Sequence, residues 1–138
     1  MPQAADCPAV TVMVPKADVG SLARVADILP PDRALIALVE TVEGLVGIHE
    51  VAMAPGVTRL PSAIWTSAPM PEFPEAERRS IRPGFQMVIA SRCAGLTQPI
   101  DGVTVALNDE AVLNEDVLRA RNLGFTAKLC IHPARSIS

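Results

Sequence analysis

Residues 34–41 read Ala-Leu-Ile-Ala-Leu-Val-Glu-Thr, an unbroken apolar run that ends in a carboxylate. A continuous apolar run, rather than an alternating one, is typical of a strand that is buried on both faces of a parallel sheet. Residues 10–14, Val-Thr-Val-Met-Val, form a second run of this kind and stop at Pro15. The two runs predict two strands of a parallel sheet.

Segments with a helical period alternate with these runs. Between Asp18 and Leu29 the apolar residues share one helical face, and Pro30-Pro31 ends the segment. Thr41 is a suitable N-cap for a second helix, which Pro55-Gly56 closes. Its two glycines, Gly44 and Gly47, each weaken that helix by about 1 kcal/mol relative to alanine, so it must depend on tertiary packing.

The second half of the chain repeats this alternation. Asn108 can cap a helix from Asp109 to Asn122, and Gly124 supplies its stop. Further strands are expected at 57–60, 102–107 and 127–131. Strands and helices in alternation indicate parallel strands joined by right-handed crossovers, which is the α/β class. A closed eight-stranded barrel needs about 200 residues or more, so this chain of 138 residues cannot close one alone.

Composition excludes several classes of function. A hydrophobic content of 49% over 138 residues predicts one domain with a core. A net charge of -3 without a basic cluster argues against a nucleic-acid partner. The three cysteines, Cys7, Cys93 and Cys130, lie far apart and suggest neither a zinc site nor a disulfide framework. With no leader-like or membrane-spanning pattern, we expect a soluble cytoplasmic protein.

Chemistry in a parallel sheet collects at the carboxyl ends of its strands. The polar residues expected there are Lys16, Glu40, Asn108, Asp109 and His132. Glu40 offers the oxygen ligand that a magnesium site takes from a strand end, although it could also be a solvated terminus or a helix-dipole partner. Lys16 could attract a phosphate or carboxylate, or it could simply face solvent.

Two other polar residues have simpler interpretations. His132 could exchange a hydrogen bond at the mouth of a site, or it could bond to the backbone at a strand end. Asp101, which precedes Gly102, fits turn chemistry that opens a strand. The sequence identifies no catalytic base.

Together with Lys128-Leu129-Cys130-Ile131-His132-Pro133, residues 34–41 resemble the citrate lyase β-subunit group of the HpcH/HpaI aldolase family. Residues 12–16, 34–44, 99–103 and 125–133 are similar to the family's fourth, fifth, seventh and eighth strand segments. The resemblance implies a partial (β/α) TIM barrel, roughly the C-terminal five strands of the eight. Residues 1–138 would then form a single incomplete barrel domain.

The resemblance also implies a chemistry. It suggests a Mg²⁺-dependent lyase that makes or breaks carbon–carbon bonds in acyl-CoA thioesters by aldol or Claisen chemistry. Glu40 would bind the metal and the substrate, and Lys16 would bind the substrate. The substrates implied are an acyl-CoA or a 2-oxo or hydroxy acid, and a homo-oligomer is expected.

One segment departs from the family pattern. Where the family has Leu-Ala-Phe-Gly-x-x-Asp, whose aspartate is the second metal ligand, residues 60–67 read Leu-Pro-Ser-Ala-Ile-Trp-Thr-Ser. Loss of one base from codons for Leu-Ala-Phe-Gly-Asn-Leu-Asp-Phe can give this reading, so we hypothesise a frameshift. We expect an irregular segment at about 61–84, with Pro83-Gly84 interrupting the next helix. Sequencing the gene tests this, and close relatives with the same residues would contradict it.

The family's first three strands and their arginine clamp have no counterpart here. We therefore expect weak Mg²⁺ affinity and negligible turnover. The alternative is a non-catalytic remnant or an interaction module that associates through its open sheet edge.

Overall fold

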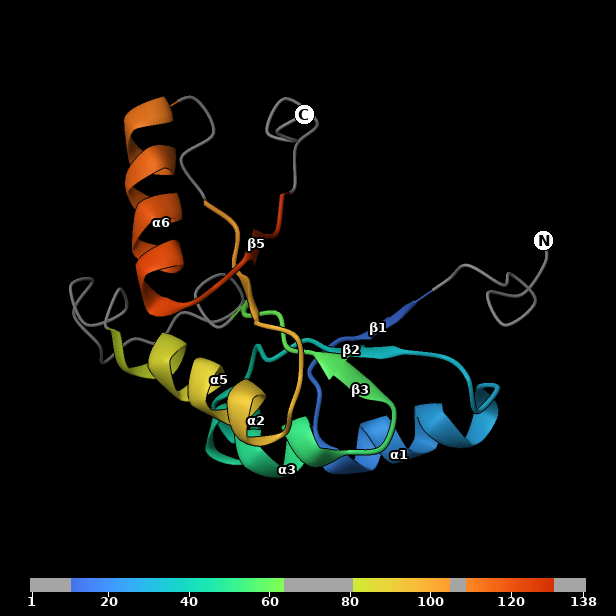
Figure 1. Ribbon diagram of the computed structural model, residues 1–138. Coiled ribbons are helices and arrows are strands. Elements are labelled where there is room, and N and C mark those ends of the chain that lie inside the picture. The colour runs from blue at the N-terminus through green and yellow to red at the C-terminus, as the bar shows by residue number, and fades with distance from the viewer. Residues whose placement is uncertain (1–10, 64–80, 105–108, 131–138) are drawn as a thin grey trace, which may run out of the picture.

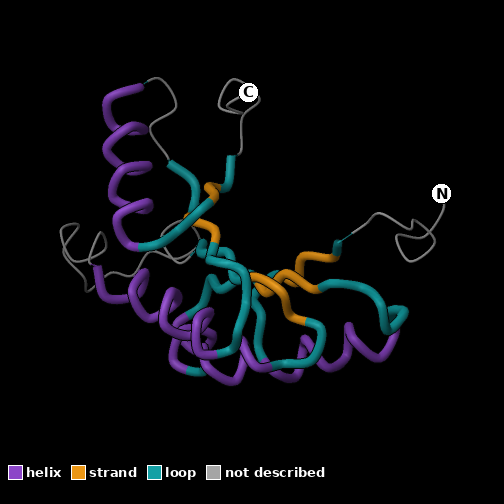
Figure 2. The backbone as a smooth tube through the Cα atoms, viewed as in Figure 1, coloured by secondary structure: helices purple, strands orange, loops and turns teal. Residues whose placement is uncertain are grey.

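The computed structural model describes residues 11–63, 81–104 and 109–130. In chain order the elements are β1 (Val12–Val14), α1 (Val19–Ile28), β2 (Leu35–Ala37), α2 (Val42–Val46), α3 (Ile48–Met53), β3 (Val57–Arg59), α5 (Ile81–Cys93), β4 (Ile100–Asp101), α6 (Glu110–Leu123) and β5 (Ala127–Lys128). Strands and helices alternate along most of the chain (Figures 1 and 2). The predicted α/β class is confirmed.

All strand pairs within the described residues are parallel, as expected. β2 lies between β1 and β3, and β4 pairs with β5. The residues after β3 join the two sheets, because Pro61 bridges Ile100 and Ser62 bridges Val39. The Ile100 N–H donates to the Leu60 carbonyl and the Ser62 N–H donates to the Ile100 carbonyl, both at 3.0 Å. The five strands therefore follow one another in chain order across the sheet.

The helices cover one face of the first three strands. Val14, Leu35, Ala37 and Val57 point into the core, which the buried residues of α1, α3 and α5 complete. In Figure 1 these helices lie below the strands, and α6 stands beside β5. Met13 points away from the core and is 41% exposed. Helices thus cover β1 to β3 on one side, and part of the other side is accessible to solvent.

Helix α1 begins and ends where the sequence predicts. Asp18 is its N-cap, and a capping box forms because the Ser21 N–H donates to Asp18 Oδ1 at 2.7 Å while the Asp18 N–H donates to Ser21 Oγ at 3.0 Å. Leu29, the C-cap, is extended ahead of Pro30. Local chemistry alone is enough to set these boundaries.

The cap makes α1 sensitive to acid. The hydrogen bond from the Ser21 backbone lowers the pKa of Asp18. A lowered folded-state pKa contributes stability above the unfolded-state pKa, and this stability is lost as the pH falls through the folded-state value. We expect Asp18→Ala to lower the melting temperature at pH 7, and the gap to wild type to shrink as the pH falls below about 4. Circular-dichroism melts across this range measure it. Asp18→Asn keeps an acceptor oxygen but does not titrate, so it serves as the control. If the melting temperature of Asp18→Asn fell with pH as steeply as that of wild type, the acid sensitivity would not come from Asp18.

The second predicted helix is divided. Thr41 caps α2 as expected, and Gly44 N–H donates to its hydroxyl at 3.0 Å. Gly47 then ends α2 and begins α3. The prediction of a single helix between Thr41 and Pro55 was therefore wrong, because Gly47 adopts a non-helical backbone at the midpoint of this segment.

Two boundaries in the second half of the chain are corrected. The strand predicted at 102–107 is not found at 102–104, which have no regular structure, and β4 is Ile100–Asp101; residues 105–107 lie outside the described residues. The cap of α6 is Asp109, whose carboxylate accepts from the Val112 N–H, whereas Asn108 lies outside the described residues. Gly124 is the predicted stop and is left-handed, with φ 103°.

The ends of the expected irregular segment at 61–84 are regular. Pro61 and Ser62 extend the sheet, and Pro83 and Gly84 lie in the first turn of α5 rather than interrupting it. A proline is tolerated there because the first N–H groups of a helix have no intrahelical partner. A Cβ on Gly84 would lie 3.2 Å from Leu123 Cδ1, so a glycine permits close approach to the end of α6. Residues 64–80, where the hypothesised frameshift falls, lie outside the description.

Two further expectations concern thiols and membranes. Among the described residues, Cys93 and Cys130 are exposed and form no disulfide. Over the same ranges, no helix has the length and apolar character needed to cross a bilayer.

Candidate functional site

The structure brings Glu40 and Lys16 together. Glu40 follows β2 and Lys16 follows β1, which is its parallel neighbour. The Lys16 backbone N–H donates to Glu40 Oε1 at 3.0 Å. The two predicted site residues therefore meet at the carboxyl edge of the sheet, through the backbone of Lys16.

The loops that carry these residues are tightly apposed. The Ala17 N–H donates to the Leu38 carbonyl at 3.0 Å, and Leu38 N–H donates to the Val14 carbonyl at 2.9 Å. A Cβ on Gly44 would lie 3.0 Å from the Ala17 carbonyl oxygen, tighter than most side-chain contacts, so the two segments would have to move apart. Gly44 thus lets the loop after Glu40 lie directly against the loop after Lys16, which fixes the edge around the carboxylate.

The donor set at this edge is compatible with a metal ion that also takes ligands from a substrate. Glu40 supplies one carboxylate, and Mg²⁺ is commonly held by one or two carboxylates together with water and substrate oxygens. No cluster of three or more His, Cys, Asp or Glu side chains suited to a metal lies within 11–63, 81–104 and 109–130. Among the described residues, this edge therefore offers the single Glu40 carboxylate and no metal-binding cluster.

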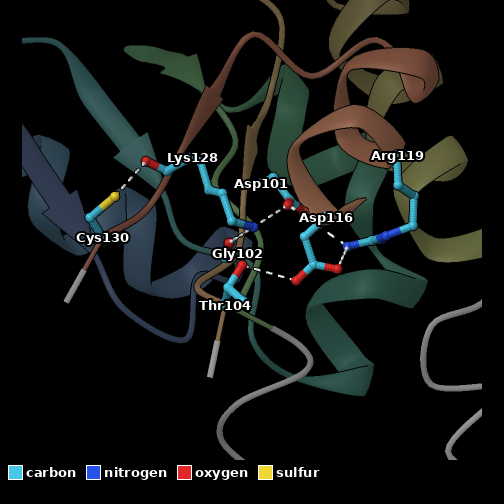
Figure 3. A network of polar contacts seen from close by, with 7 residues as sticks. All are labelled: Asp101, Gly102, Thr104, Asp116, Arg119, Lys128 and Cys130. Atoms are coloured by element: carbon cyan, nitrogen blue, oxygen red, sulfur yellow. Dashed lines mark hydrogen bonds and ion pairs between the residues drawn. The ribbon is translucent and has the colours of Figure 1, made fainter. Parts of the chain in front are cut away.

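A second polar cluster, comprising Asp101, Gly102, Thr104, Asp116, Arg119 and Lys128, lies across β4, β5 and α6 (Figure 3). The Lys128 ammonium donates to Asp101 Oδ2 and to the Gly102 carbonyl, both at 2.7 Å. The side chains of Asp101 and Lys128 are only 6% and 13% exposed. Because both charges are buried, loss of either one would leave the other without a counter-charge.

Helix α6 joins this cluster. Asp116 Oδ2 accepts from the Thr104 hydroxyl at 2.9 Å, and Asp116 Oδ1 lies 3.3 Å from Arg119. Arg119 also lies 3.9 Å from Asp101. The cluster fastens the ends of β4 and β5 to the helix between them.

Sequence reasoning missed this cluster. Asp101 was interpreted as a turn residue that opens a strand, which is wrong, because it ends β4 and is buried. The signal was its parallel pairing with Lys128, which requires the strand register to be known. His132 lies outside the described residues. Asp109 acts as the cap of α6.

The chain is similar to several known proteins over most of its length. A (3S)-malyl-CoA thioesterase of Cereibacter sphaeroides is 30% identical over 135 residues, which cover 95% of this chain and 46% of that protein. The crystal structure of RipC from Yersinia pestis superposes with a TM-score of 0.80 at 25% identity, covering 94% of this chain and 62% of RipC. The citrate lyase β subunit of Mycobacterium tuberculosis, complexed with oxaloacetate and magnesium, superposes with a TM-score of 0.70 at 25% identity, covering 92% and 58%. These similarities support the HpcH/HpaI family.

The chain spans about half the length of the thioesterase it matches. No protein-family model matches the sequence. In this structure Lys16, Glu40 and Asp101 lie at or just after the carboxyl ends of parallel strands.

Proposed function

We propose that this chain forms the carboxyl-terminal five strands of a (β/α) barrel that acts on acyl-CoA thioesters, with Glu40 as a Mg²⁺ ligand. The observation that carries the proposal is the contact of Glu40 with the Lys16 backbone at the carboxyl edge of β1 and β2. This edge is where barrel enzymes assemble their sites. Relatives named for malyl-CoA and for oxaloacetate with magnesium support this substrate class.

The barrel part of the proposal rests on the sheet. Parallel strands are nearly always covered on both faces, yet Met13 is 41% exposed on the face opposite the helices. The sequential order of all five strands is the order found in a barrel wall. We propose a single barrel domain over residues 1–138 that is incomplete by itself and assembles with further copies.

In the proposed chemistry the metal ion and the protein have different roles. A bound Mg²⁺ would polarise a substrate carbonyl or carboxylate while charge develops on an enolate, as aldol or Claisen cleavage requires. Glu40 would hold the ion, and Lys16 would lie at the rim of the substrate site. Among the described residues, no general base is identified at this edge. The role that we propose for the chain in the reaction is therefore to bind and orient the ion and the substrate. The exposed thiols of Cys93 and Cys130 suit the cytoplasmic location that we propose.

Weak metal binding follows from a single carboxylate. A ligand at a concentration equal to its Kd stabilises the folded state by only about 0.4 kcal/mol, and at 100 Kd by about 2.7 kcal/mol. We therefore expect Mg²⁺ alone to raise the melting temperature little, and Mg²⁺ with a matching acyl-CoA to raise it more. A thermal-shift titration with Mg²⁺ and a small acyl-CoA panel measures this. Glu40→Gln, which keeps shape and removes charge, should abolish the Mg²⁺-dependent part.

The same titration tests the alternative. A clear melting transition with no response to any ligand would favour a non-catalytic remnant or an interaction module, and light scattering would then report association through the sheet edge. Turnover by the purified chain should be negligible. Mg²⁺-dependent cleavage of any acyl-CoA would contradict that expectation.

A further inference from the structure

The backbone of Lys16 is in an unusual conformation. Its φ of 46° lies in the left-handed region, and over the described ranges no other non-glycine residue has a positive φ. A residue with a side chain adopts this region at a cost of about 1–2 kcal/mol. Such outliers persist where the surrounding structure requires them, often at functional sites. The question is what this turn accomplishes.

The turn directs one N–H group at one carboxylate. Strand β1 ends at Val14, whose carbonyl is bonded to the Leu38 N–H, and the Ala17 N–H is bonded to the Leu38 carbonyl. The chain between these two anchors must reverse within Pro15 and Lys16, and the left-handed turn leaves the Lys16 N–H 3.0 Å from Glu40 Oε1. A hydrogen bond from a backbone N–H to an ionised carboxylate is stronger than a neutral one.

We propose that Lys16 is a positioning residue for Glu40, and that it acts through its backbone N–H rather than through its ammonium group. The inference rests on the proposed function, in which Glu40 binds the metal. Glutamate has several rotatable bonds, and a ligand carboxylate must be held in one orientation to bind an ion well. The Lys16 turn supplies that restraint from the neighbouring strand.

This assignment differs from a direct role of Lys16 in substrate binding. A point-charge role needs the ammonium and is indifferent to the backbone. A positioning role needs the N–H and the turn and is indifferent to the side chain. Lys16→Gln removes the ammonium and keeps the N–H. Lys16→Gly also keeps the N–H and relieves the left-handed strain, so it should raise the melting temperature.

Mn²⁺ serves as the probe, because its paramagnetism broadens nearby amide signals even when binding is weak. In the full chain, Mn²⁺ is titrated into ¹⁵N-labelled protein and the broadening of the amides of residues 40–44 is followed. Lys16→Gln and Lys16→Gly should leave the titration midpoint close to that of wild type. An α-hydroxy acid at position 16, which replaces the N–H with an ester oxygen, should weaken binding by about 10–100-fold. Glu40→Gln should weaken it at least as much.

The outcomes separate this inference from the proposed function. If Glu40→Gln leaves the midpoint unchanged, Glu40 is not the ligand and the proposed function fails. If Glu40→Gln weakens binding while the ester variant does not, the inference fails and the proposed function stands. Loss of affinity in Lys16→Gln equal to that of the ester variant would assign the role to the ammonium and overturn the inference.

A second measurement keeps the inference testable if the ester variant does not fold. The Lys16 amide proton, bonded to a carboxylate, should resonate downfield in wild type and move upfield in Glu40→Ala. An unchanged Lys16 signal would overturn the inference, whatever the metal titration shows.

Discussion

Replacement of Asp101 with alanine lowers the expected free energy of unfolding by about 3–5 kcal/mol, because it leaves the buried Lys128 ammonium without its counter-charge. The two side chains are 6% and 13% exposed and lie 2.7 Å apart. β4 and β5 contain only two residues each, so few backbone bonds can offset the loss. Urea unfolding followed by circular dichroism measures the change.

Asp116 provides the matched control. Its carboxylate belongs to the same cluster but is 19% exposed, and its partner Arg119 is 33% exposed. Asp116→Ala should cost no more than about 2 kcal/mol, the sum of a weak ion pair and one hydroxyl hydrogen bond. Asp101→Ala combined with Lys128→Ala should be less destabilising than the sum of the single changes, because neither charge is left alone. Equal losses for Asp101→Ala and Asp116→Ala would contradict the importance of the buried pair.

Replacement of Leu60 with alanine should cost about 2–5 kcal/mol, because it opens a cavity in the core. Leu60 is 0% exposed, and its carbonyl accepts the hydrogen bond from Ile100 that joins β4 to the strands before it. The side chain therefore packs at the junction of the two sheets. The measured quantity is again the free energy of unfolding in urea.

Two control variants test whether the loss of stability in Leu60→Ala comes from the buried cavity rather than from the removal of apolar atoms in general. Leu60→Met nearly conserves volume and should cost less than about 1.5 kcal/mol. Val46→Ala removes apolar atoms from a residue that is 81% exposed, and should change stability by no more than about 0.5 kcal/mol. A loss for Leu60→Ala as small as that for Val46→Ala would show that the two sheets are not joined through this side chain.

Local chemistry in the sequence predicted the elements whose boundaries depend on a few adjacent residues. Thr41 caps a helix and Gly124 stops one as expected, because a capping hydrogen bond or a left-handed glycine is a property of one turn. The apolar run of residues 34–39 correctly predicted β2, because the apolar composition of a buried strand is visible in its own sequence. Lys16 and Glu40 were found because each follows such a run.

Boundaries that depend on distant partners were not predictable in this way. Residues 102–107 have the β-branched composition of a strand. In the structure Ile100 pairs instead with Pro61 and Ala127, and Asp101 pairs with Lys128. Pro83 and Gly84 suggested a helix break, but position in the first turn and contact with Leu123 make both acceptable in α5. In each case the choice depends on energy from contacts between segments far apart in sequence.

The sequence by itself determined the α/β class and the parallel strands, and it pointed to the two residues proposed for the site, because apolar periodicity and strand-end polarity are local properties. Only the tertiary structure decided that Lys16 meets Glu40 through its backbone N–H, and that Asp101 is buried against Lys128. The register of neighbouring parallel strands decides both contacts. Register is set by the packing of the whole sheet and cannot be read from any single segment.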